Sequence, residues 1–410
     1  MSDDYFASYA GKPEALKREE EPANALAARL QRSRGSRLTR EIISPMWTKP
    51  YGKTGKNISV IGFGAMRFAN PADLDASAAV VRHAHARGIN YFDTAPYYCD
   101  DRSEEIMGRA FQTMPRDSYY VSTKCSEADG DALRASLKRS LKRLGVDSID
   151  FFHIWCLLRP EQLDERRKGG AIVAAQQAKA EGLIKHLVVS SHLNGEDNAS
   201  VLKSGLFEGI TVGYNAINFP FRAKTLEAAA KHNLGVATMN PLGGGLIPRN
   251  AARLTFLKGP QDQDVVQAAL RFNISQPAIT SALVGFANER EVDEAVAAVE
   301  NFQPYPADHI ERIKGSIGAS FEGFCTGCGY CIPCPVNVEI PKLMDTFNQK
   351  ILNGTVDAMR DRLKWHWSLS PDVAAACTEC GACEDACTQH LPIRARLHEI
   401  AALAQGQPKG

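Results

Sequence analysis

Short apolar runs rich in β-branched residues alternate along most of the chain with segments that have helical periodicity. Eight apolar runs that we interpret as strands cover residues 58–65, 89–95, 118–124, 148–155, 184–191, 209–215, 234–240 and 280–285. Helical periodicity is found at 75–88, 131–145, 225–233, 264–273 and 291–302. Eight strand–helix units in about 250 residues predict an α/β fold, the (β/α)8 TIM barrel.

A doubly wound dinucleotide-binding fold is the alternative that the same alternation allows. Its fingerprint needs three glycines between the first strand and the following helix. Here Gly62 and Gly64 are present, but Arg67 stands where the third glycine should be. The sequence therefore favours the barrel.

The end of the chain has a different pattern, because eight of the 11 cysteines lie there in two short runs. The runs consist of Cys325, Cys328, Cys331 and Cys334, and of Cys377, Cys380, Cys383 and Cys387. Apolar residues recur at helical spacing between the runs, which predicts a small α-helical module. Three thiols at every third position can surround one cubic cluster, and the fourth cysteine of such a run usually ligates the other cluster. We therefore predict two [4Fe–4S] clusters.

Zinc is the main alternative for these thiols. Zinc sites usually hold two cysteine pairs separated by a longer spacer, and disulfides would need an oxidising compartment that nothing in the sequence indicates. Two details depart from the common iron–sulfur spacing. The first run ends in C-x-x-C rather than C-x-x-x-C, and Thr388 rather than proline follows Cys387.

Composition limits the partners. The net charge of +1 gives no electrostatic case for binding nucleic acid or an anionic membrane. No apolar run approaches the length of a membrane span, and the first residues lack a secretory signal, so we expect the cytoplasm. We expect a charged extension at 1–45, the barrel at 46–302, a linker at 303–320 and the cysteine module at 321–410.

Candidate catalytic residues lie at the carboxyl ends of the predicted strands, where the chemistry of a TIM barrel is found. Asp93 lies at the end of the second strand, Tyr97 and Tyr98 follow it, and Lys124 ends the third strand. A phenol becomes a workable proton donor when an ammonium stabilises its phenolate and a carboxylate holds that ammonium. These three residue types on one face predict a general acid.

A family resemblance follows from these motifs. INYFDTAPYY, together with SEEIMGRAF, VSTK and GVATMNPLGGGL, resembles the aldo/keto reductases over residues 51–302. Residues 321–393 resemble the alpha-helical ferredoxin domains, and the combination is similar to the aldo/keto reductases that carry a ferredoxin-like carboxyl terminus. The resemblance implies NAD(P)H-dependent reduction of a small-molecule carbonyl substrate, with Tyr98 as general acid supported by Asp93 and Lys124.

The fourth strand departs from the family pattern, which would place a histidine at Trp155. Here the histidine is His153, two residues earlier on the same strand face and therefore deeper in the barrel. Either His153 orients the carbonyl, or Trp155 has replaced it with its single N–H donor. A core histidine without a catalytic role is the third alternative.

The same resemblance implies cofactor positions. Ser190 and Ser191 fall where the family has Ser-Asn facing the nicotinamide amide. Glycine-rich backbone after strand seven and a helix amino terminus after strand eight could receive phosphate. The residues concerned are Pro241, Leu242, Gly243, Gly285, Asn288 and Arg290. Arg290 favours a 2′-phosphate, but Ala295 stands where an asparagine often contacts adenine, so NADP(H) and NAD(H) both stay open.

Nicotinamide transfers two electrons as a hydride, whereas an iron–sulfur cluster takes one, and the sequence has no flavin motif to couple them. Three hypotheses follow. The barrel is a carbonyl reductase with structural or regulatory clusters, or the chain relays single electrons to or from a partner flavoprotein, or the clusters reduce a barrel-bound substrate without NADPH. We favour the first because Asp93, Tyr98 and Lys124 occur together.

Overall fold

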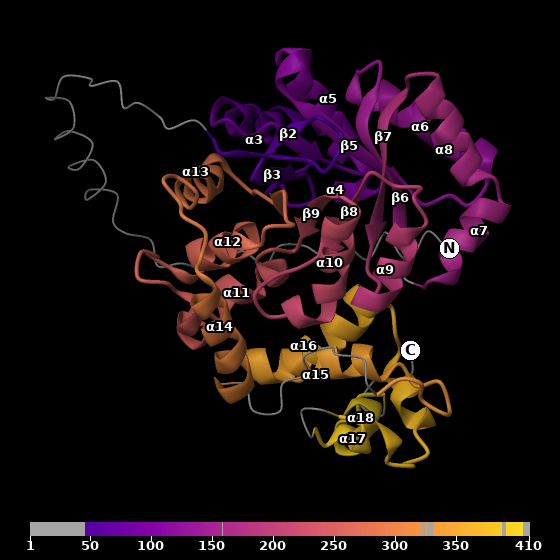
Figure 1. Cartoon of the computed structure of the whole chain (residues 1–410), viewed down its shortest axis with the longest axis vertical. Coiled ribbons are helices and arrows are strands. Elements are labelled where there is room, and N and C mark those ends of the chain that lie inside the picture. Colours follow the sequence, from indigo (N-terminus) through magenta and orange to yellow (C-terminus); the bar gives the residue numbers. More distant parts are fainter. Residues whose placement is uncertain (1–45, 158, 321–324, 326–330, 388–390, 405–410) are drawn as a thin grey trace, which may run out of the picture.

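Eight parallel strands form the closed barrel at the centre of the protein (Figure 1). The computed structural model describes residues 46–157, 159–320, 325, 331–387 and 391–404, so the extension expected at 1–45 lies outside the described residues. The barrel order is β10-β3-β4-β5-β6-β7-β8-β9. The strands are β3 (Ile61–Gly64), β4 (Tyr91–Asp93), β5 (Tyr120–Cys125), β6 (Ile149–Leu157), β7 (Ile184–Ser191), β8 (Gly209–Gly213), β9 (Gly235–Met239) and β10 (Ser281–Val284). The predicted TIM barrel is confirmed.

The first expected strand, 58–65, is in fact two strands. Its beginning belongs to β2 (Asn57–Ser59), which pairs antiparallel with β1 (Thr48–Pro50), and only β3 enters the barrel. The turn between β1 and β2 inserts the fully buried Tyr51 into the barrel floor. A Cβ atom at Gly209 or Gly235 would overlap the Tyr51 ring, so both positions require glycine. The hairpin therefore closes the amino-terminal end of the barrel.

Helices cover the outside of the barrel between successive strands. They are α3 (Leu74–Ala86), α4 (Tyr98–Asp101), α5 (Ser103–Phe111), α6 (Gly130–Leu144), α7 (Glu161–Lys168), α8 (Ala171–Ala180), α9 (Gly195–Lys203), α10 (Ala223–Lys231), α11 (Leu246–Arg249), α12 (Val265–Ser275) and α13 (Glu289–Ala297). Several begin at an Asp or Asn whose side chain accepts a hydrogen bond from a backbone N–H of the first turn, as at Asp73, Asp129 and Asp264.

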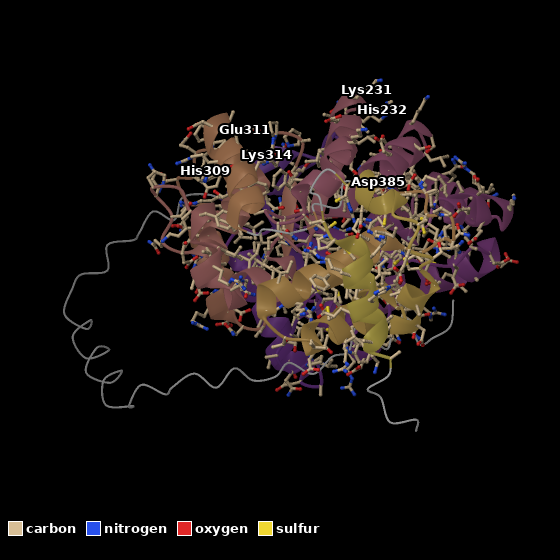
Figure 2. All side chains as sticks on the ribbon, turned by 90° about the horizontal axis from the view of Figure 1, so that it is seen from below. Lys231, His232, His309, Glu311, Lys314 and Asp385 are labelled. Atoms are coloured by element: carbon tan, nitrogen blue, oxygen red, sulfur yellow. The ribbon has the colours of Figure 1, made fainter. Side chains whose placement is uncertain are left out.

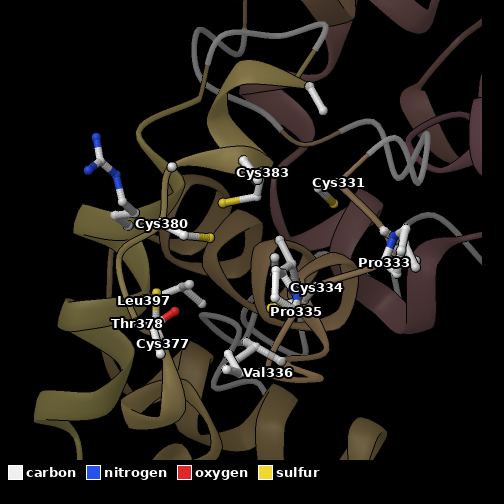
Figure 3. Close-up of a pocket in the computed structure, with 17 residues that line it drawn as sticks. Cys331, Pro333, Cys334, Pro335, Val336, Cys377, Thr378, Cys380, Cys383 and Leu397 are labelled. Atoms are coloured by element: carbon white, nitrogen blue, oxygen red, sulfur yellow. The ribbon is translucent and has the colours of Figure 1, made fainter.

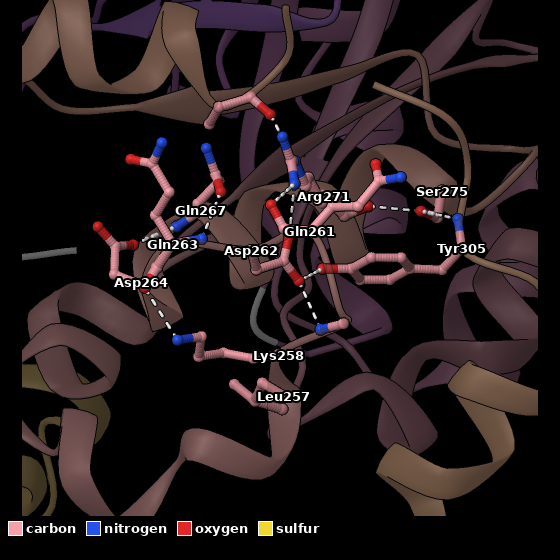
Figure 4. A network of polar contacts seen from close by, with 12 residues as sticks. Leu257, Lys258, Gln261, Asp262, Gln263, Asp264, Gln267, Arg271, Ser275 and Tyr305 are labelled. Carbon is pink, nitrogen blue, oxygen red and sulfur yellow. Dashed lines mark hydrogen bonds and ion pairs between the residues drawn. The ribbon is translucent and has the colours of Figure 1, made fainter. Parts of the chain in front are cut away.

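The stretch expected as a linker at 303–320 contains helix α14 (Ala307–Ser320). A buried ion pair joins Asp262 to Arg271 of α12 at 2.6 Å. The Tyr305 hydroxyl donates to the same Asp262, and the Tyr305 N–H donates to Ser275 Oγ at 2.9 Å (Figure 4). These contacts attach the chain ahead of α14 to the barrel. The domain limits themselves stay predictions.

A helical module follows α14, as the sequence predicts. It contains α15 (Ile340–Asn353), α16 (Asp357–Asp361), the π-helical turn η7 (Arg362–Trp367), the 3-10 turn η8 (Pro371–Ala376), α17 (Ala382–Asp385) and α18 (Ile393–Ala402). Apolar side chains such as Leu343, Met344 and Leu397 form its own core. No helix among the described residues is both long and apolar enough to cross a membrane.

The module contacts loops that follow the carboxyl ends of the barrel strands. Arg253, after β9, donates to the carbonyl oxygens of Ile351 and Leu352 at the end of α15, at 2.7 and 3.2 Å. His192, directly after β7, lies with its ring centroid 6.3 Å from that of His366 in η7. Viewed from below, the module's helices lie in front of the barrel, with α14 beside them (Figure 2). The module therefore covers part of the barrel face where the active site is expected.

Candidate active site and cysteine module

A buried ion pair lies at the carboxyl ends of β4 and β5. Lys124 Nζ pairs with Asp93 Oδ1 and donates to the carbonyl oxygen of Thr94 at 2.7 Å. The Lys124 side chain is 2% exposed and that of Asp93 is 6% exposed. Burial lowers the pKa of Lys124, and the Asp93 carboxylate opposes that change. The Asp93 carboxylate therefore holds the Lys124 ammonium in place.

Two further residues extend this pair into the barrel interior. Ser122 Oγ donates to Asp93 Oδ2 at 2.7 Å, and His153 Nε2 lies 2.9 Å from Ser122 Oγ. His153 is fully buried, and burial followed by the Lys124 ammonium lowers its pKa well below the ordinary value. The imidazole is thus neutral at physiological pH. Ser122 shares the inward face of β5 with Lys124, but a serine at that position has no catalytic signature in the sequence.

Tyr98 and Trp155 complete the aromatic side of the site. Lys124 Nζ lies 5.4 Å from the centroid of the Tyr98 ring. The Trp155 indole contacts Tyr98 edge to face, with ring centroids 5.7 Å apart at 82°. Trp155, where the resemblance places a histidine, is therefore the β6 residue beside Tyr98. His153 lies one layer deeper, in contact with Ser122 and Asp93.

An unusual left-handed turn carries Tyr98. Tyr97, Cys99, Asp100 and Asp101 have φ values of 70°, 56°, 55° and 63°. Residues other than glycine are rarely found there, since each such conformation costs energy. The Asp101 carboxylate compensates, because it accepts the Tyr97 N–H at 3.0 Å and two guanidinium hydrogen bonds of 2.7 and 2.6 Å from a neighbouring arginine, Arg143. The turn around Tyr98 is thus held by Asp101 of α4 together with Arg143 of α6.

The two serines of β7 have different surroundings. Ser191 Oγ accepts the N–H of Leu193 at 3.1 Å. Ser190 Oγ is buried and has no hydrogen-bond partner among the described residues. An unpartnered buried hydroxyl is costly unless a ligand satisfies it. Ser190 therefore fits the nicotinamide amide contact that the sequence predicts for it.

The other expected nucleotide positions lie in the loops after β9 and β10. Gly243 stands in a glycine turn after Pro241 and Leu242, with φ 64°. Gly285 leaves room for the side chain of Arg67.

At the start of α13 the expected positions already have partners within the protein. Asn288 Oδ1 accepts the Glu291 N–H at 3.1 Å, and the Glu291 carboxylate accepts the Ala287 N–H at 2.9 Å. Arg290 is exposed and pairs with Glu294 at 3.3 Å. The amino terminus of α13 is capped by its own side chains, so these nucleotide contacts stay predictions.

In the module, thiols from both cysteine runs surround one cavity of about 220 Å³. Cys334 of the first run and Cys377, Cys380 and Cys383 of the second line it, and Cys331 also borders it (Figure 3). Apolar side chains such as Leu397 complete the wall. As positioned, the described side chains include no group of three or more ligands close enough to hold a metal ion. Cysteine thiols from both runs on one wall are the donor set that an iron–sulfur cluster uses.

Cys325 and Cys387 lie elsewhere in the module. The Cys325 N–H donates to Asn348 Oδ1 at 2.9 Å, and Asn348 Nδ2 donates back to the Cys325 carbonyl oxygen at 2.8 Å. Cys387 is 9% exposed and belongs to the apolar core of the module, which also contains Leu343 and Leu397. Cys328 lies outside the described residues.

Three features together define the class of protein, an oxidoreductase with an iron–sulfur region. They are the barrel, the buried Lys124–Asp93 ion pair and the thiol-lined helical module. The aldo/keto reductase family model matches residues 60–317, and the model of the 4Fe-4S dicluster domain matches residues 324–391. The chain therefore belongs to the aldo/keto reductase family, in the subgroup with a carboxyl-terminal 4Fe-4S dicluster domain.

Individual relatives agree with this assignment. L-galactose dehydrogenase from Arabidopsis thaliana is 27% identical over 287 residues, which cover 63% of this chain and 89% of the relative. D-threo-aldose 1-dehydrogenase from Pseudomonas sp is 26% identical over 286 residues, which cover 56% of this chain and 86% of that relative. An aldo-keto reductase from Bacillus halodurans in its holo form superposes with a TM-score of 0.58 at 22% identity, over 66% of this chain and 96% of that one, which supports the fold.

Proposed function

We propose that the barrel reduces a small-molecule carbonyl compound with NAD(P)H and that Tyr98 is the general acid. The main support is the buried Lys124–Asp93 ion pair, which lies beside the Tyr98 ring. The Lys124 ammonium is 5.4 Å from the centroid of that ring. The named relatives are dehydrogenases of sugars, which supports a small polar carbonyl or alcohol as substrate.

The residues have distinct tasks in this proposal. A bound nicotinamide would supply the hydride, and Ser190 Oγ would hold its amide. Tyr98 donates its phenolic proton to the carbonyl oxygen, and the Lys124 ammonium stabilises the resulting phenolate. Asp93 keeps the ammonium oriented. The neutral His153 is a positioning residue that acts on Asp93 through Ser122, while Trp155 forms the wall beside Tyr98.

We further propose two [4Fe–4S] clusters. Each cluster takes three cysteines from one run and its fourth cysteine from the other run. The first cluster site consists of Cys325, Cys328, Cys331 and Cys387. The second cluster site consists of Cys334, Cys377, Cys380 and Cys383. All four ligands of the second site line the cavity described above, together with Cys331 of the first site, and this lining supports the second site.

Replacing Tyr98 with phenylalanine tests the proposed acid. We expect reduction of a reactive aldehyde such as a nitrobenzaldehyde to fall by about 10²- to 10⁴-fold, because that is the usual contribution of a general acid. The matched control is Tyr97→Phe, which removes the neighbouring phenol and should keep activity. Cluster absorbance should be the same in both variants. Full activity in Tyr98→Phe would rule out the acid.

A second function is favoured by the position of the module over the carboxyl-end loops. Two one-electron transfers through the clusters, with two protons, would reduce a barrel-bound carbonyl compound to an alcohol, and a low-potential electron carrier protein would supply the electrons. Electron paramagnetic resonance of the anaerobic protein with NADPH separates the two functions. Bound NADPH that leaves the clusters oxidised supports hydride transfer, whereas turnover with a reduced carrier protein and without NADPH supports the second function.

A further inference from the structure

Strand β6 contains a bulge just before it ends. Ile154 pairs with Val189 of β7. The next pair is Leu157 with Ser191, so β6 advances three residues where β7 advances two. Cys156, inside the bulge, has a φ of 65°, which residues other than glycine rarely adopt. Bulges are common next to active sites, where they change the direction of a side chain.

The other residue of the bulge is Trp155. It is 5% exposed and belongs to a small apolar cluster with Tyr97 and Tyr98. Its indole contacts the Tyr98 ring edge to face, with ring centroids 5.7 Å apart. The position of this indole therefore bears directly on the position of the proposed acid.

A buried arginine of α7 holds the backbone of the bulge. Arg166 is 2% exposed, and its Nη2 donates to the carbonyl oxygen of Trp155 at 2.9 Å. The same Nη2 donates to the carbonyl oxygen of Ser126 at 3.2 Å, and Nη1 donates to that of Gln162 at 3.0 Å. Ser126 directly follows β5, two residues after Lys124. Arg166 thus joins the ends of the two strands that carry Lys124 and Trp155.

The acceptors around Arg166 are neutral carbonyl oxygens. In the described part of the chain, no carboxylate forms an ion pair with its guanidinium. Burying a charge without a counter-charge costs free energy, and such departures from pure stability are typical of functional sites. The next residue of the same helix is an ordinary surface arginine. Arg167 has a side chain that is 44% exposed and pairs with Asp164 at 2.9 Å.

We propose that Arg166 is a positioning residue for carbonyl reduction. Its guanidinium holds the β6 bulge against the end of β5 and thereby keeps the Trp155 indole on the Tyr98 ring. Arg166 contacts neither substrate nor nicotinamide and acts through Trp155. A displacement of about 1 Å at a reacting group can cost on the order of 10²-fold in rate, so a loosened bulge lowers turnover. This inference rests on the function proposed above.

A double-mutant cycle tests whether Arg166 acts through Trp155. The proteins are wild type, Arg166→Met, Trp155→Ala and the double variant, and the measurement is kcat and KM for NADPH-dependent reduction of a nitrobenzaldehyde. We expect Arg166→Met to lower kcat by about 10- to 100-fold while KM is nearly unchanged. In the Trp155→Ala background the same substitution should have little further effect, because the positioned side chain is absent. Arg167→Met is the matched control and should keep the wild-type kcat.

Near-ultraviolet circular dichroism measures the same coupling without catalysis. The spectrum of wild type minus that of Trp155→Ala isolates the signal of the packed indole. The spectrum of Arg166→Met minus that of the double variant isolates the indole in the loosened bulge. We expect this second difference to be much weaker than the first, since an indole without a fixed environment gives little signal.

The outcomes separate this inference from the proposed function. Losses of kcat that multiply in the double variant, or two equal difference spectra, would overturn the role of Arg166. If wild type lacks carbonyl reduction, or Tyr98→Phe keeps it, the proposed function fails and the difference spectra alone decide on Arg166. If Arg166→Met does not fold, Arg166→Gln takes its place in both measurements, because its neutral side chain is too short to reach both carbonyl oxygens.

Discussion

Removing the Lys124 ammonium should leave a buried carboxylate without its cation. In Lys124→Met the side-chain volume is nearly kept, and Asp93 retains Ser122 as a side-chain donor at 2.7 Å. Breaking a buried ion pair by deleting one partner typically costs about 3–5 kcal/mol. Since domains are stable by about 5–15 kcal/mol, the loss should be easily measured.

The pH dependence of that loss tests its cause. Without Lys124, the buried Asp93 carboxylate has no cation to offset its charge, and burial disfavours the charged form. Protonation removes that charge, so the destabilisation is smaller at low pH and grows as the pH rises. The deficit of Lys124→Met relative to wild type should therefore shrink between pH 8 and pH 5.5.

Urea unfolding of the anaerobic protein, followed by tryptophan fluorescence, measures these differences. The double variant Asp93→Asn, Lys124→Met carries neither charge, so it should lose less stability than the two single effects combined, by about 0.5–3 kcal/mol. Lys138→Met replaces an exposed lysine of α6 and controls for the substitution. The ion-pair argument is refuted if the free energy of unfolding of Lys124→Met lies within about 0.5 kcal/mol of the wild-type value, or if the two single effects add strictly in the double variant.

Two more predictions concern buried polar atoms inside the barrel. Burial holds the pKa of His153 well below its unfolded value of about 6.5, so its contribution to stability is complete above that value and falls by about 1 kcal/mol as the pH drops to 5.5. His153→Gln should remove this part of the pH dependence of urea unfolding, and an identical pH profile would contradict it. Ser190→Val should weaken NADPH binding about tenfold in a fluorescence titration, whereas Ser191→Val should not. Equal affinity in both variants would remove Ser190 from the cofactor site.

The barrel and the helical module could be predicted because their signals are local. Alternating strand and helix patterns needed only short windows, and cysteine spacing needed no tertiary structure. The inward face of β5 was equally available, yet Ser122 was missed because a serine has no catalytic signature until Asp93 and His153 are seen on either side of it. A single-strand interpretation of 58–65 failed where Val60 separates the hairpin strand from the barrel strand.

Other features depend on contacts between distant segments, which periodicity does not encode. The left-handed turn at Tyr98 needs Arg143 of α6 to hold Asp101. The place of the module depends on Arg253 and His192, whose loops give no pattern of their own. In each case the sequence does not show which distant segments contact each other.

Tyr51 fills the floor of the barrel, so ligands reach the Lys124–Asp93 pair from the opposite end, where the module lies. Under the proposed function, nucleotide, substrate and product would share that opening. The rate of product release would then depend on how firmly the module is seated there. Loading the cysteine sites would change turnover through the rigidity of that opening, without any electron crossing to the barrel.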